Sequence, residues 1–107
     1  MIEVTLFRDS NGLPVRLKVS GHAERGPYGS DIVCAAASAL VETLRIGFER
    51  VVHQTYHGAI QDGEADVTWS LPIGAEARAL VETIGQALKD LAETEPDAVS
   101  FHEVGVP

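Results

Sequence analysis

The hydrophobic period changes along this chain, and this change limits the folds that it can adopt. Apolar residues alternate with polar ones from Ile2 to Leu6 and again from Leu13 to Val19, and the turn-forming segment Asp9-Ser10-Asn11-Gly12 lies between them. A period of two is typical of a strand with one buried face. Because Asn and Gly tolerate the left-handed conformations of tight turns, these residues predict a β-hairpin.

A helical period follows the hairpin. Apolar residues recur three or four positions apart, which predicts one long helix over residues 31–56. Gly47 lies inside this segment and weakens a helix by up to ~1 kcal/mol relative to alanine. Gly58 lies just beyond it and is expected to end the helix. The residues that set the helical period are Val33, Ala37, Leu40, Leu44, Phe48, Val51 and Val52.

The second half of the chain repeats this change of period. Residues 59–61 and 64–71 flank Asp62-Gly63 and predict a second hairpin. A helix over residues 77–94 and a strand over 98–104 follow, and Trp69 and Phe101 are expected in the core. The order is β-β-α-β-β-α-β. Since two helices on one sheet bury both apolar stripes, we predict a two-layer α+β fold with a mixed sheet of about five strands. The 107 residues fit a single domain, 1–107.

The charge balance excludes some classes of partner. Sixteen acidic residues against eight basic ones give a formal net charge of -8. Such a surface repels phosphate backbones, so we expect no direct nucleic-acid binding, and a basic protein or peptide is a more natural partner. No apolar run approaches the ~18 residues of a membrane helix. The N-terminal segment lacks the pattern of a signal peptide, so we expect a cytoplasmic protein with no membrane association.

Residues 21–38 carry the candidate chemistry. His22 follows the second predicted strand, and the single cysteine, Cys34, falls in the first turn of the predicted helix, with Ser30 or Asp31 as its N-cap. A helix start has unpaired N–H groups and a partial positive charge, which favour a thiolate and could receive an oxyanion. This effect is worth only about 0.3–1 kcal/mol, so a fully reactive thiolate needs a second positive group. His22 is the candidate.

This pair predicts nucleophilic catalysis. Cys34 attacks a carbonyl carbon, His22 protonates the leaving amine, and water releases the thioester. Gly21, Gly26 and Gly29 suit a loop that bends around a peptide or closes over it, or they form turns and nothing more.

Each candidate also has a structural interpretation. Cys34 could be a small buried residue in an alanine-rich helix, and His22 could be a structural histidine at a strand end. Asp31 either caps the helix or orients His22. Ser38, one turn after Cys34, either forms a hydrogen bond near the site or allows close packing.

The same segment resembles a known family. Gly21-His22-Ala23, followed over residues 26–38 by Gly-x-x-Gly-x-Asp-Ile-Val-Cys-Ala-Ala-x-Ser, is similar to the ribosomal-processing cysteine proteases of the Prp family. The resemblance implies removal of the N-terminal extension of large-subunit ribosomal protein twenty-seven. It implies a His22–Cys34 dyad, with Asp31 and Ser38 at supporting positions, and a homodimer. No cofactor is expected.

Two other functions are compatible with this sequence. The chain could be a non-enzymatic acidic module that binds a ribosomal protein or an assembly factor, or the dyad could transfer an acyl or thiol group. His53 and His57 would share a face of the predicted helix, but no third ligand has a helpful spacing, so we expect no metal and assign His57 to the helix C-terminus. The sequence contains neither a phosphate-binding loop nor a serine nucleophile elbow.

Overall fold

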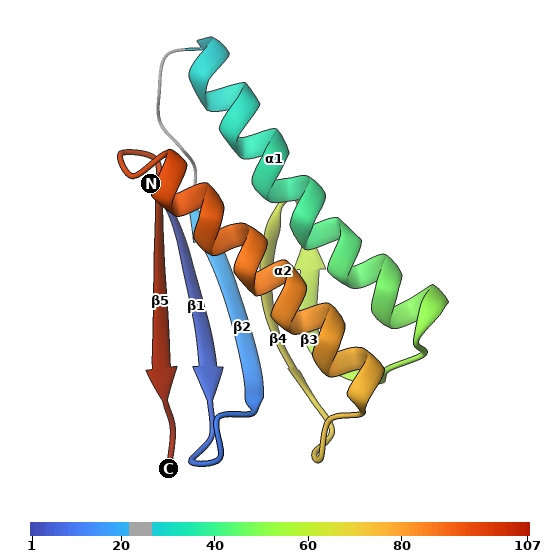
Figure 1. Ribbon diagram of the computed structural model, residues 1–107. Coiled ribbons are helices and arrows are strands. Elements are labelled where there is room, and N and C mark those ends of the chain that lie inside the picture. The colour runs from blue at the N-terminus through green and yellow to red at the C-terminus, as the bar shows by residue number, and fades with distance from the viewer. Residues whose placement is uncertain (22–26) are drawn as a thin grey trace.

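The computed structural model describes residues 1–21 and 27–107, with only the backbone described for residues 27–31. Figure 1 shows five strands behind two helices. The elements, in chain order, are β1 (Ile2–Arg8), β2 (Pro14–Gly21), α1 (Pro27–Ile46), the π-helical turn η1 (Gly47–Val51), β3 (Tyr56–Gln61), β4 (Glu64–Trp69), α2 (Ala75–Thr94) and β5 (Val99–Gly105).

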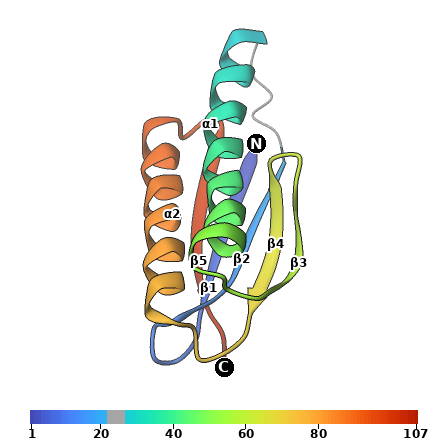
Figure 2. The ribbon, with the colours of Figure 1, turned by 90° about the vertical axis from the view of Figure 1, so that its right-hand side faces the viewer.

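The strands form one mixed sheet in the order β3-β4-β2-β1-β5. β1 and β5 are parallel and the other neighbours are antiparallel. Figure 2 shows α1 and α2 side by side on one face of this sheet, which leaves the other face open. The predicted α+β fold, its element order and both hairpins are therefore confirmed.

The core lies between the sheet and the two helices. Buried residues alternate along β1, β2 and β4, as expected for strands with one covered face: Ile2, Val4 and Leu6 in β1, Leu17 and Val19 in β2, and Ala65, Val67 and Trp69 in β4. Phe48 stacks edge-on against Trp69, with ring centroids 5.8 Å apart. The indole N–H of Trp69 donates a hydrogen bond to the carbonyl of Pro14 at 2.9 Å. The prediction that Trp69 is a core residue is confirmed, and Phe101 packs against the core while partly buried.

The first helix begins earlier than the sequence predicted. It begins at Pro27, not at Asp31. Proline suits the first helical position, because its ring fixes φ and no N–H is lost from the hydrogen-bond pattern there. Ser30 and Asp31 therefore lie inside α1, and their prediction as N-caps is wrong.

The same helix also ends earlier, at Ile46, and η1 extends it to Val51. His53 then adopts a left-handed conformation, with φ of 51°, and the N–H of Gln54 donates to the carbonyl of Phe48 at 2.8 Å. A left-handed residue and a bond of this kind commonly end helices. The predicted helix end near residue 56 is wrong, as is the role of Gly58, which lies in β3.

Candidate active site

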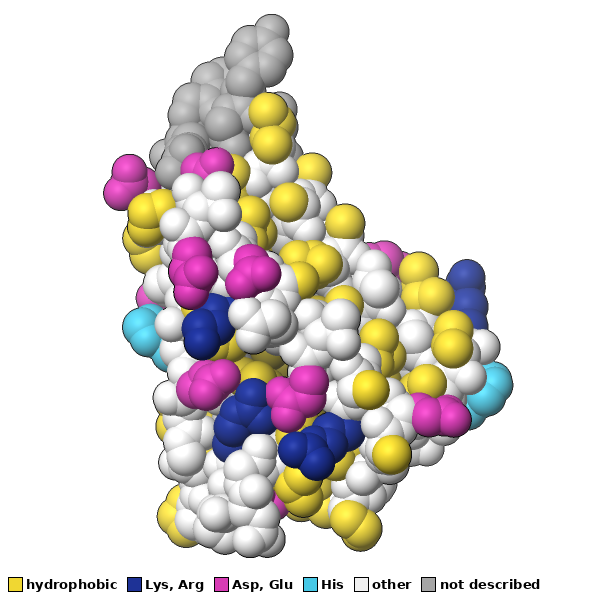
Figure 3. Space-filling view, in the orientation of Figure 1, with side chains coloured by type: hydrophobic (Ala, Val, Ile, Leu, Met, Phe, Trp, Pro, Cys, Tyr) yellow, Lys and Arg dark blue, Asp and Glu magenta, His cyan; other side chains and the backbone are white. Residues whose placement is uncertain are grey.

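Cys34 lies on α1, seven residues beyond the first residue of the helix. At 3.6 residues per turn, this is about two turns from the helix start. The side chain is half-buried and packs against the core. Nearby, Ile32 is 69% exposed, and Figure 3 shows hydrophobic side chains gathered along α1 while charged ones gather over α2. Cys34 therefore lies at the edge of the core.

This position changes the electrostatics expected for Cys34. The partial charge of a helix terminus acts mainly within the first turn, and only the first four N–H groups lack partners inside the helix. Cys34 lies beyond the first turn and beyond these four N–H groups. The prediction that the helix start itself favours the thiolate and receives the oxyanion is wrong. The predicted activation of Cys34 then depends on the second positive group, for which His22 is the candidate.

Of the other predicted site residues, the structure fully describes only Gly21 and Ser38. Gly21 ends β2, and Ser38 lies on α1 one turn beyond Cys34. Gly29 and Asp31 contribute backbone to α1, and the side chain of Asp31 lies outside the described part of the structure. His22 and Gly26 also lie outside the described residues.

Ser38 packs against the turn between β3 and β4. A Cβ atom added to Gly63 would lie 2.3 Å from the Ser38 hydroxyl oxygen, so the glycine is in tight contact with this side chain. This contact favours the packing interpretation of Ser38 over a hydrogen-bonding role in catalysis. It also places the tip of the β3–β4 hairpin beside the helix that carries Cys34.

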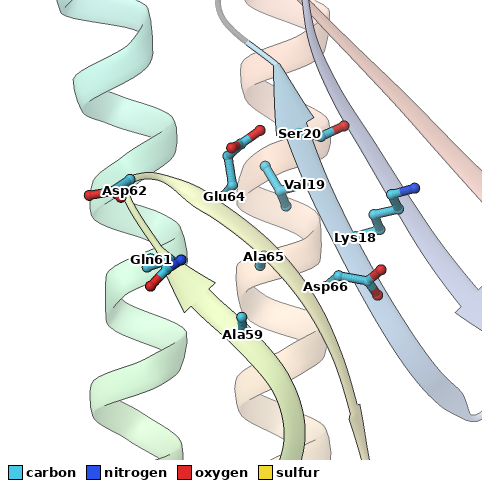
Figure 4. Close-up of a pocket in the computed structure, with 9 residues that line it drawn as sticks. All are labelled: Lys18, Val19, Ser20, Ala59, Gln61, Asp62, Glu64, Ala65 and Asp66. Carbon is cyan, nitrogen blue, oxygen red and sulfur yellow. The ribbon is translucent and has the colours of Figure 1, made fainter.

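Glu64 is a residue that the sequence analysis did not single out. Its carboxylate accepts a hydrogen bond from the backbone N–H of Gly21, with 3.0 Å between the nitrogen and Oε2. In Figure 4 the Glu64 side chain reaches from the start of β4 toward the end of β2. In the sequence Glu64 is only a polar position of an alternating strand. The contact depends on how β4 pairs with β2, which the alternation does not specify.

A shallow hollow of about 280 Å³ lies between β2 and the β3–β4 hairpin (Figure 4). Asp66, one of its carboxylates, pairs with Arg16 through two hydrogen bonds of 2.8 Å. These bonds lower the pKa of Asp66 below its usual range. The residues that line the hollow are Lys18, Val19, Ser20, Ala59, Gln61, Asp62, Glu64, Ala65 and Asp66.

The histidine pair considered as a metal site is not on one helical face. His53 follows the end of η1, and His57 lies in β3, so the prediction that His57 complements the helix C-terminus is also wrong. Among the side chains described, those of residues 1–21 and 32–107, no three of His, Cys, Asp or Glu are grouped so that they could hold a metal ion. Within the same part of the chain, no helix combines the length and apolar character needed to cross a bilayer.

Comparison with known proteins identifies the family. The family model for cysteine protease Prp matches residues 1–100. The chain belongs to the Prp family. The expected resemblance is therefore confirmed, and with it the assignment of the chain as a cysteine protease. A search of curated proteins finds no match.

Solved structures share the fold of this Prp-family chain. SMU.848 from Streptococcus mutans is 28% identical, with a TM-score of 0.78, and the match covers 99% of this chain and 96% of that one. The essential ribosomal processing protease Prp from S. aureus has been solved with a covalently linked product peptide and with a substrate peptide. The first is 24% identical with a TM-score of 0.86, and the second 23% identical with a TM-score of 0.84. Each match covers 96% of this chain and 99% of the other.

Proposed function

We propose that this chain is an endopeptidase that removes the N-terminal extension of large-subunit ribosomal protein twenty-seven, with Cys34 as nucleophile and His22 as acid–base partner. The family match over residues 1–100 carries the proposal, because it includes the whole segment in which both residues lie. The S. aureus relative, a ribosomal processing protease, has been crystallised with peptides. The proposal includes a homodimer acting in the cytoplasm.

The nucleophile is assigned by the composition of the chain. A cysteine protease needs a cysteine thiolate that reaches the substrate, and Cys34 is the single cysteine in the sequence. Its half-buried position leaves part of the side chain open to a bound peptide.

The acid–base partner is supported by the positions of the other histidines. His57 pairs with Thr68, and His102 pairs with Thr5, so both lie on the open face of the sheet, away from α1. His53 follows the far end of the helix, on the order of 25 Å from Cys34 at 1.5 Å per residue. His22 is the remaining histidine of the four in the sequence.

The charge of the chain supports a basic substrate. With a formal net charge of -8, the enzyme attracts a positively charged ribosomal protein segment at long range. The reaction needs no cofactor. Cys34 forms a thioester with the acyl part of the substrate, His22 gives a proton to the leaving amine, and water attacks the thioester to regenerate the thiol.

The test is cleavage of a synthetic peptide that spans the N-terminal extension, followed by mass spectrometry. We expect wild type to cut one bond, and Cys34→Ala and His22→Ala to lose at least a hundredfold in rate, since general acid–base catalysis alone contributes about 10²–10⁴-fold. His57→Ala is the matched control and should retain full activity, because this histidine lies on the open face. Cleavage by Cys34→Ala would remove the cysteine from the mechanism.

Alkylation of Cys34 separates the enzyme from the alternatives. A reactive thiolate is expected to alkylate quickly well below pH 8, and His22→Ala should slow this reaction. Reaction only in denaturant would favour the non-enzymatic binding module. A product carrying an acceptor group in place of water would show acyl transfer instead of hydrolysis.

A further inference from the structure

The pairing between β2 and β4 stops short of the end of β2. The last partners are Val19 and Ala65, although β2 continues to Gly21. In an antiparallel or parallel ladder, the N–H groups of alternate residues point to opposite neighbours. The N–H of Ile2 points to β5, where it donates to the carbonyl of Ala98. It follows that the N–H of Gly21, opposite Ile2, points away from β1 and toward β4.

The backbone of β4 no longer runs beside Gly21 at this point, and a side chain supplies the acceptor. The Glu64 carboxylate accepts the Gly21 N–H at 3.0 Å. Gly21 itself has a φ of 93°, and a Cβ there would lie 2.2 Å from the carbonyl oxygen of Met1, so the strand end fits closely between β1 and Glu64.

Gly63, which precedes Glu64 in the turn between β3 and β4, packs against the helix that carries Cys34. Gly63 is in tight contact with Ser38, one turn along α1 from Cys34. Two adjacent residues, Gly63 and Glu64, therefore contact the nucleophile's helix on one side and the end of β2 on the other. In sequence, the residue that follows Gly21 is His22.

We propose that Glu64 is a positioning residue for catalysis: its hydrogen bond to Gly21 fixes the strand end from which His22 follows, relative to the helix that carries Cys34. This rests on the proposed function, in which His22 and Cys34 react together. Glu64 does not touch the reacting atoms. It acts through the backbone, and what it supplies is an acceptor oxygen at the right distance.

The test compares three replacements of Glu64. Glu64→Ala removes the acceptor, and we expect kcat to fall by roughly tenfold or more with a smaller change in KM, because a misplacement of about 1 Å in a catalytic group can cost up to 10²-fold. Glu64→Gln keeps an acceptor oxygen at the same reach and should stay within about threefold of wild type. Glu64→Asp is one methylene shorter and should give an intermediate kcat. Glu3→Ala, an exposed carboxylate opposite Ser20 on β1, is the matched control and should leave kcat unchanged.

The second readout is the pH profile of Cys34 alkylation in the absence of substrate. Glu64→Ala should slow alkylation at neutral pH and move the profile toward that of His22→Ala, while Glu64→Gln should follow wild type. A Glu64→Ala profile identical to wild type would overturn the positioning role, as would a Glu64→Gln variant impaired as strongly as Glu64→Ala. A peptide that is not cut by wild type would overturn only the proposed substrate, since the alkylation profile does not depend on it.

Discussion

Each of the two hairpins of the sheet has a left-handed glycine in its turn, but the two glycines have different surroundings. Gly12, between β1 and β2, has a φ of 80°, and Gly63, between β3 and β4, has a φ of 76°. A Cβ on Gly12 would have no neighbour within 4 Å, whereas a Cβ on Gly63 would meet the Ser38 hydroxyl at 2.3 Å. The local requirement for a left-handed residue is the same, but only Gly63 also serves tertiary packing.

The turn between β1 and β2 is stabilised by hydrogen bonds from polar side chains at the same end of the sheet. The Asp9 carboxylate accepts the N–H groups of Asn11 at 2.9 Å and Leu13 at 3.0 Å. Arg8 donates to the carbonyl of Gly12 at 3.0 Å and, through two further bonds of 2.9 and 2.7 Å, to Glu82 on α2. Figure 1 shows this turn at the opposite end of the sheet from the start of α1. It serves the fold and is remote from the candidate site.

The largest expected effect is that of alanine at the second turn. Gly63→Ala adds the cost of a left-handed alanine, about 1–2 kcal/mol, to the cost of overpacking against Ser38, about 1–3 kcal/mol. We expect the free energy of unfolding in urea to fall by about 2–5 kcal/mol. Gly12→Ala carries only the backbone cost and should lose about 1–2 kcal/mol. Equal losses at the two glycines would show that the contact with α1 carries no energy.

A double variant sharpens this difference. Ser38→Ala removes the hydroxyl that a Cβ on residue 63 would meet, although the Ser38 Cβ, 3.3 Å away, remains. In the Gly63→Ala background, we expect this second change to recover about 1 kcal/mol, a coupling typical of residues in contact. A double-mutant cycle by urea denaturation measures it. The same Ser38→Ala change combined with Gly12→Ala should be additive.

At the first turn, the side chain of Asp9 is the weak point. Asp9→Ala removes the acceptor for two backbone N–H groups, and by comparison with helix caps should cost about 1 kcal/mol. Cleavage of the substrate peptide should change less than twofold, since this turn is far from the site. A large loss of kcat with little loss of stability would break the distinction between a structural turn and a catalytic one.

The smallest expected effect is a pH dependence at the first turn. Glu82 accepts hydrogen bonds from Arg8, and these bonds lower the pKa of the Glu82 carboxyl. A carboxyl whose folded pKa is depressed stabilises the protein above its unfolded pKa, about 4.3, and loses this contribution as the pH falls through the folded value. Because the pair is partly exposed, we expect about 0.5–1 kcal/mol. Thermal melts at pH 7 and pH 3 should show a smaller acid-induced loss for Glu82→Gln than for wild type.

The features of the fold that could be predicted from the sequence are those set by residues close together in the sequence. Alternating apolar residues predicted the strands of both hairpins, and the helical period predicted both helices. Each of these patterns depends only on residues that are close together in the sequence. The start of α1 was misplaced because Gly26-Pro27-Tyr28-Gly29 has the composition of a loop, although a helix begins at its proline. The roles of Glu64 and Gly63 depend on contacts with β2 and α1, which no local pattern contains.

The bond between Glu64 and Gly21 makes one strand end adjustable. A main-chain carbonyl is identical at every position, so a strand fixed only by its neighbours cannot be moved by a single substitution without disturbing the sheet. Here the acceptor is a side chain, whose length and charge one codon change can alter. Relatives that need a slightly different spacing between the strand end and the helix could obtain it at this one exposed position while the sheet stays as it is.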